Sequence, residues 1–148
     1  MRDYVDLALI HEHMIPLWNV CWAAPGKDDS WSPLSLIEKI AATSGFRQAD
    51  IDAGILATID VDVASIIGIV RGAIDEARDV CPRLPPELAG RLFVDDKGAI
   101  VSDPDRIVSG AVQVIEAQKG GAFPSSPDID RGIIQHLVDV FGRNGVKE

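Results

Sequence analysis

One helical pattern dominates the middle of this chain of 148 residues. Apolar side chains recur there at steps of three and four residues, which places them on one face of an α-helix, whereas a half-buried strand would alternate polar and apolar residues. The pattern runs through Ala49, Ile51, Ile55, Ile59, Val63, Ile66, Ile67, Val70, Ile74 and Ala77. Such a stripe is stable only when it packs against other apolar faces, so it predicts a mainly α fold.

The centre of this stripe has two interpretations. Asp60 and Asp62 are good N-caps, and Gly54 together with the β-branched residues near 58–62 weakens helical continuity, so we expect two helices rather than one. A strand over 57–63 is the alternative, because apolar and polar residues alternate there with a period of two. The sequence leaves helix and strand open for this segment.

Two further helices are expected before the stripe. Helical spacing of apolar residues predicts the first over about residues 3–23. Pro16 lies inside it, lacks a backbone donor and crowds the preceding turn, so a kink or a break is expected there. After a loop rich in Pro, Gly and Asp, Ser32 and Pro33 supply an N-cap and a first helical residue, and the second helix extends to about Thr43.

The second half of the chain is expected to contain one β-hairpin. Residues 91–94 and 99–101 are short apolar runs, and the acidic turn between them ends in Gly98. This arrangement is typical of two antiparallel strands joined by a tight turn.

Two helices are expected after the hairpin. Asp103-Pro104 caps and opens the first, which carries apolar residues as far as Ile115 and stops at Gly120-Gly121. Asp128 or Asp130 begins the second, which closes the chain.

Length and composition fit one globular domain that spans residues 1–148. A chain of this length buries about two-thirds of its extended surface in a single core. Hydrophobic residues make up 47% of the chain and charged residues 25%, which is ordinary for a globular protein. We therefore expect a compact, mainly α, helical bundle of about five or six helices with one β-hairpin.

The acidity of the chain limits the classes of molecule that it is expected to bind. Its formal net charge is -9, so nucleic-acid phosphates repel it. Cys21 and Cys81 are too few for a disulfide framework and indicate reduced thiols. No apolar run reaches the roughly 20 residues of a membrane span, and the first residues lack the pattern of a secretory signal. The expectation is a cytoplasmic protein that binds neither nucleic acid nor membrane and needs no cofactor.

His11 and His13 form a candidate metal site. Two residues apart, they could ligate one metal if the backbone were extended, because their side chains would then point the same way, whereas on a helix they diverge by about 200°. His136 is the third candidate ligand. This interpretation gives an alternative function, a small metal-binding or hydrolytic enzyme centred on the N-terminal pair. The other interpretation places His11 in a core or an interface and His13 on a solvated face.

Aromatic residues and an acidic turn supply the candidate partner-binding positions. Trp18 and Trp22 lie about one helical turn apart, and tryptophan is common in interface hot spots, although the pair could equally fill a small core. Phe123 lies in a loop of Gly, Ser and Pro, which is typical of a partner-contacting element. Asp95 and Asp96 would steer a basic partner, with turn capping as the alternative role.

Residues 48–54 and 64–72 resemble, in outline, the two helices of a helix-turn-helix repressor. The resemblance implies DNA binding through the second helix, whose exposed Ser65, Gly68 and Arg71 would have to contact base edges. Two packed core helices are the other explanation of the pattern.

The sequence favours association over catalysis, because it is acidic, concentrates tryptophan and holds no coherent catalytic set. We expect a small acidic cytoplasmic protein that acts through protein–protein association, of an immunity, antitoxin-like or adaptor type. Its partner would be a basic protein or a second copy in a homodimer. The metal-binding enzyme and the DNA-binding regulator are the two alternatives.

Overall fold

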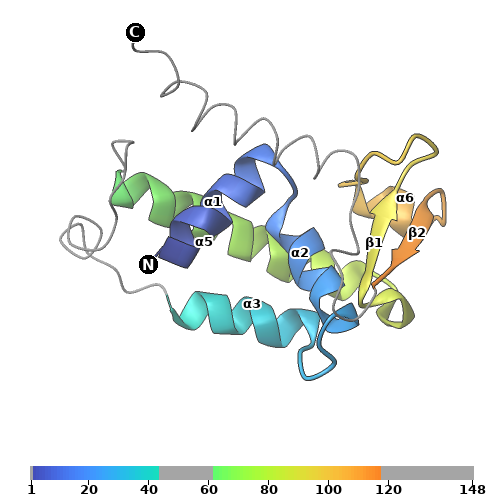
Figure 1. Ribbon diagram of the computed structural model, residues 1–148, viewed down its shortest axis with the longest axis horizontal. Coiled ribbons are helices and arrows are strands. Elements are labelled where there is room, and N and C mark those ends of the chain that lie inside the picture. Colours follow the sequence, from blue (N-terminus) through green and yellow to red (C-terminus); the bar gives the residue numbers. More distant parts are fainter. Residues whose placement is uncertain (1, 44–61, 118–148) are drawn as a thin grey trace, which may run out of the picture.

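A computed structural model describes residues 2–43 and 62–117 of the chain (Figure 1). The expectations for the first half of the apolar stripe, over 49–61, for the loop with Phe123 and for the last helix with His136 lie outside the described residues. In chain order the described elements are α1 (Arg2–His13), α2 (Leu17–Ala23), η1 (Ala24–Gly26), α3 (Pro33–Ala42), α5 (Val63–Val80), η2 (Cys81–Arg83), η3 (Pro86–Leu88), β1 (Arg91–Val94), α6 (Pro104–Val108) and β2 (Gln113–Glu116).

Pro16 divides the N-terminal helical region into two helices. It has φ -52° and ψ 140°, outside the helical region, and α2 begins directly after it. The N–H groups of Met14 and Ile15 both bond the carbonyl of Ile10, at 3.0 and 2.9 Å, and so close the end of α1. The break expected at the proline is confirmed, and its cause is the missing donor and the fixed φ of that residue.

α3 and α5 begin where the sequence supplies N-caps. The Ser32 hydroxyl accepts the N–H of Ser35 at 3.1 Å, and the Ser35 hydroxyl accepts the N–H of Ser32 at 2.8 Å, a reciprocal capping box. Asp62 accepts the N–H groups of Ala64 and Ser65, each at 3.2 Å. These side chains satisfy donors that the first turn of a helix leaves free. The expected starts of both helices are confirmed.

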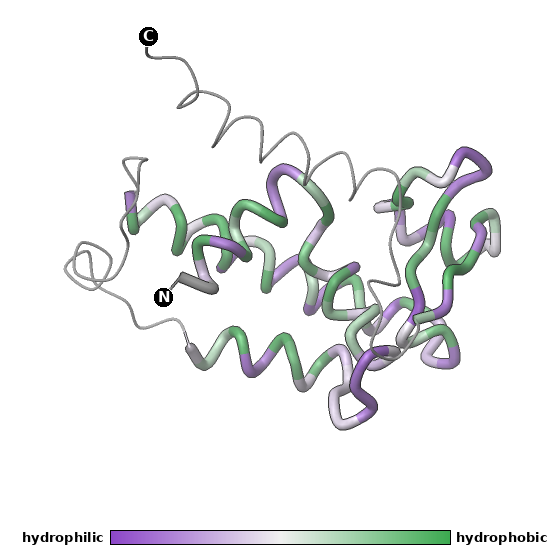
Figure 2. The backbone as a smooth tube through the Cα atoms, in the orientation of Figure 1, coloured by the Kyte–Doolittle hydropathy of each residue, from purple (hydrophilic) through white to green (hydrophobic). Residues whose placement is uncertain are grey.

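α5 is the central helix of the bundle. It contacts α1, α2 and α3, which lie around it in Figure 1. Its buried residues follow helical spacing and are Val63, Val70, Ala73, Ile74, Ala77 and Val80. They pack with the buried residues of α2. On α3, hydrophobic and hydrophilic segments also alternate along the helix (Figure 2). The second half of the apolar stripe is therefore one core-facing helix.

Two glycines join the helical bundle to the sheet. The N–H of Gly90 donates to the carbonyl of Trp22 at 2.8 Å. Gly26 lies so close to Gly90 that a Cβ at either position would collide with the backbone of the other. Gly90 also has φ +89°, a conformation that other residues rarely adopt. No side chain fits at this contact between η1 and the start of β1.

The two-stranded sheet does not pair the strands that the sequence predicted. β1 pairs with β2 in antiparallel register, with Phe93 opposite Val114. Residues 99–101 contribute an isolated bridge between Val94 and Ile100 rather than a strand. The predicted hairpin is therefore wrong in its second strand, although the turn after β1 is present.

The helix expected from Asp103-Pro104 to Gly120-Gly121 is wrong beyond Val108 in the described residues. α6 ends at Val108, and Gly110 then turns the chain with φ +75°. Three of the four residues in 112–115 are β-branched, which favours an extended strand where a partner strand is present. Pairing with β1 outweighs the helical spacing of these apolar residues.

The described residues confirm a mainly α fold with one two-stranded antiparallel sheet. In this part of the chain, no helix combines the length and the hydrophobicity needed to cross a bilayer. The expectation of a single domain over the whole chain stays a prediction.

Candidate functional site

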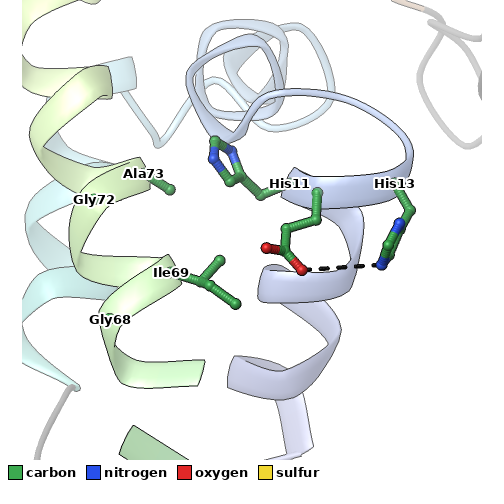
Figure 3. Close-up of a pocket in the computed structure, with 7 residues that line it drawn as sticks. His11, His13, Gly68, Ile69, Gly72 and Ala73 are labelled. Carbon is green, nitrogen blue, oxygen red and sulfur yellow. Dashed lines mark ion pairs between the residues drawn. The ribbon is translucent and has the colours of Figure 1, made fainter. Parts of the chain in front are cut away.

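The histidine pair borders a groove between α1 and α5 (Figure 3). The volume of the groove is about 490 Å³. Its α5 wall includes Gly68 and Gly72, where an added Cβ would meet no described atom within 4 Å. Two glycines on one helix face therefore leave room beside the histidines.

His11 and His13 do not converge on a common point. α1 is helical through both, and Figure 3 shows the His11 and His13 side chains directed to different sides of α1. His11 Nδ1 accepts the N–H of Leu17, the first residue of α2, at 3.1 Å. His13 Nε2 lies 3.9 Å from Glu12 Oε2 on an exposed face. His11 thus bridges the α1–α2 break, and His13 faces solvent.

Metal binding gains no support from the described residues. No group of three or more His, Cys, Asp and Glu side chains lies close enough there to hold a metal ion. His136 falls outside those residues, so the three-histidine site stays a prediction.

Trp18 and Trp22 lie in the core. Their exposed fractions are 0% and 4%, and both belong to the cluster that packs against α5. Trp22 Nε1 donates to the carbonyl of Leu88 at 3.0 Å, which anchors α2 to the segment before β1. Both tryptophans therefore fill the core, which was the second of the two interpretations of the pair. A partner would contact them only if the core opened.

Asp95 and Asp96 have different surroundings. Asp95 Oδ1 accepts the N–H of Ala99 at 2.9 Å and that of Lys97 at 2.8 Å. These two bonds hold the pKa of the Asp95 carboxyl below its usual value. Asp95 therefore caps the turn, whereas the neighbouring Asp96 is exposed. Their role in steering a basic partner stays a prediction.

The segment that resembles a recognition helix is part of α5. Ser65, Gly68 and Arg71 are exposed as expected, but the helix continues well past them and its opposite face is buried in the core. The other half of the motif, 48–54, lies outside the described residues. DNA binding through this segment stays a prediction.

β2 is an exposed edge strand. β1 is buried over three of its four residues, whereas in β2 only Ile115 is partly buried and Val114 is 41% exposed. One edge of β2 pairs with β1, and no strand of the described residues pairs with the other edge. Figure 1 shows β2 at the end of the molecule, beyond β1 as seen from α1 and α3.

A pocket between α2, α3 and β1, which we call the α2–α3 pocket, was not predicted from the sequence. Its volume is about 430 Å³. Its apolar lining includes Ile15, Val20, Trp31, Leu36 and Leu92. Asn19 also lines it and is only 1% exposed. The available signal was this single amide inside the apolar run of α2, together with a third tryptophan shortly before α3.

Comparison with protein-family models, with curated proteins and with solved structures finds no match to this chain. The candidate sites are therefore interpreted from their own geometry.

Proposed function

We propose that the chain is a small acidic cytoplasmic protein that acts through protein–protein association, and that a second copy binds it edge to edge through β2. The observation that carries this proposal is the open edge of β2 in the described part of the chain. The two reduced, buried thiols support the cytoplasmic assignment. The net charge of -9 supports a protein partner rather than nucleic acid.

An open edge strand is a template for pairing with another strand. Proteins that must avoid such pairing place charged side chains, Lys above all, or Pro or a bulge on the edge. β2, with the sequence Gln-Val-Ile-Glu, contains neither Lys nor Pro, and its one charged residue, Glu116, is paired with Arg91 of the same chain. A sheet of two strands is also marginally stable by itself. Two copies joined through β2 would form a sheet of four strands and cover apolar surface that each copy exposes.

The sequence of β2 suits pairing with itself. Around a two-fold axis normal to the sheet, Val114 can lie opposite Val114 of the copy, which places Val112 opposite Glu116. No like charges then lie directly opposite each other. Glu116 already pairs with Arg91 of its own chain, with Nη2 and Oε1 3.1 Å apart, which reduces its repulsion across the interface.

Sedimentation equilibrium of the full chain tests the proposal. Wild type should give a dimer mass. Val114→Lys should shift the population to monomer, because the two introduced lysines, one from each copy, would lie opposite each other and repel. Leu34→Lys is the matched control, since Leu34 is 47% exposed and lies on α3, away from β2. A wild-type monomer at all concentrations, or a dimer that Val114→Lys leaves intact, would overturn the proposal.

A further inference from the structure

We infer that the α2–α3 pocket binds a neutral, planar aromatic molecule that carries one hydrogen-bond donor, as indole and phenol do. The inference is independent of the dimer proposed above, because the pocket and β2 share no residue.

The pocket has the size and the lining of a small-molecule site. Small-molecule pockets have volumes of about 300–1,000 Å³ and are lined mainly by apolar and aromatic side chains with a few polar groups. The α2–α3 pocket, at about 430 Å³, lies in the lower part of that range. Lys27 and Asp28 also line the pocket, and their opposite charges add no net charge to it. The rest of the wall is mostly apolar and would strip water from a charged ligand without replacing it, which favours a neutral molecule. Trp31 offers a flat surface on which a ring can stack.

Asn19 gives the pocket a buried hydrogen-bond acceptor. Its amide nitrogen donates to the carbonyl of Val101 at 3.2 Å, so this donor is already used. Its amide oxygen is buried and has no partner among the described residues. A buried acceptor without a partner is costly, and a ligand that donates to it removes that cost.

The same amide therefore favours donors over acceptors. Because Asn19 is 1% exposed, the side chains around it must shift slightly when a ligand reaches its oxygen. The bond to Val101 keeps the nitrogen in place, so a ligand that only accepts hydrogen bonds gains nothing from Asn19.

Titration of the full chain with indole and with indene tests the inference. The two probes have nearly the same shape, but only indole carries an N–H donor. Followed by protein-observed NMR, indole should bind with a Kd near or below about 1 mM, a strength ordinary for a ligand of so few atoms. Indene should bind about 5-fold more weakly, the loss expected for one hydrogen bond. The shifted signals should include the side-chain amide of Asn19 and the indole N–H of Trp31.

A filled pocket supplies the control. Val20→Phe adds volume from the partly exposed side of α2 and leaves Asn19 intact, whereas Val108→Phe makes the same change on α6, outside the pocket. Indole affinity should fall at least 10-fold in Val20→Phe and stay unchanged in Val108→Phe. The inference is overturned if indole does not bind, if indene binds equally well, or if Val20→Phe, folded by its NMR spectrum, still binds indole like the wild type.

Discussion

At the scale of single residues, His11 has a structural role that its sequence motif does not suggest. Its Nδ1 accepts the first N–H of α2 across the break at Pro16. His11→Ala should lower the free energy of unfolding by about 1 kcal/mol, the usual cost of losing a side-chain bond to a helix start. Urea denaturation measures this loss. His13→Ala is the control, because His13 is exposed, and it should leave stability unchanged; equal losses in both variants would contradict the assignment.

The two buried thiols predict how stability depends on pH. Burial raises the pKa of Cys21 to about 12, with a further contribution from the nearby Cys81, and burial raises the pKa of Cys81 to about 11. An unfolded thiol has a pKa of about 8.5. The unfolded chain therefore loses protons that the folded chain keeps. Stabilisation by the neutral thiols is complete below about pH 8.5 and is lost as pH rises from there toward the folded pKa values.

Urea denaturation between pH 7 and 10.5, in the presence of a reductant, measures this effect. Each thiol should contribute a loss of about 1.4 kcal/mol per pH unit once the unfolded thiol has ionised. The double variant Cys21→Ala/Cys81→Ala provides the reference, since it keeps every other titrating group. If its stability falls with pH as steeply as that of the wild type, the thiols are not the cause.

At the scale of elements, the glycine after α6 separates a helix from a strand. Gly110 has φ +75°, and an added Cβ would meet no described atom within 4 Å, so the cost of Gly110→Ala is backbone strain alone, about 1 kcal/mol. Gly72→Ala, in α5, also meets no described atom but has helical backbone, and it should stabilise the protein by roughly the same amount. Thermal denaturation should give changes of opposite sign. A Gly110→Ala variant as stable as the wild type, or more stable, would show that the positive φ at Gly110 does not set the end of α6.

The elements that sequence predicts well are those whose cause is local. Ser32, Asp62 and Pro16 set helix boundaries through their own atoms and their nearest neighbours in the chain, so their effects could be read without a structure. The partner of β1 could not, because residues 112–115 have both helical spacing and β-branched side chains. Which preference prevails depends on a strand about 20 residues away.

The candidate sites also divide into features that are local in the sequence and features that depend on distant parts of the chain. A histidine pair is visible in the sequence, but the bond that occupies His11 depends on where α2 starts. The α2–α3 pocket brings together residues from α2, from the loop before α3 and from β1, and no spacing along the chain signals that meeting.

At the scale of the whole molecule, the charge predicts how self-association depends on salt. Two copies that each carry a net charge of -9 repel each other, and the repulsion is screened over about 30 Å at 0.01 M salt but about 8 Å at 0.15 M. The dimer dissociation constant should therefore decrease as salt rises from 0.01 to 0.15 M, measured by sedimentation equilibrium at several protein concentrations. A basic partner would show the opposite dependence. A dimer that weakens with salt would contradict a symmetric contact between two acidic surfaces.

The contact between Gly26 and Gly90 has a consequence for tracing the ancestry of this fold. Substitution at either position is blocked by the backbone of the other, so both of these sites, more than sixty positions apart, have to remain glycine. Surface positions in a diverging lineage accept many substitutions, whereas these two glycines accept none. A remote descendant would be recognised by glycine at both places, each next to the same structural neighbours, long after its overall identity to this chain had faded.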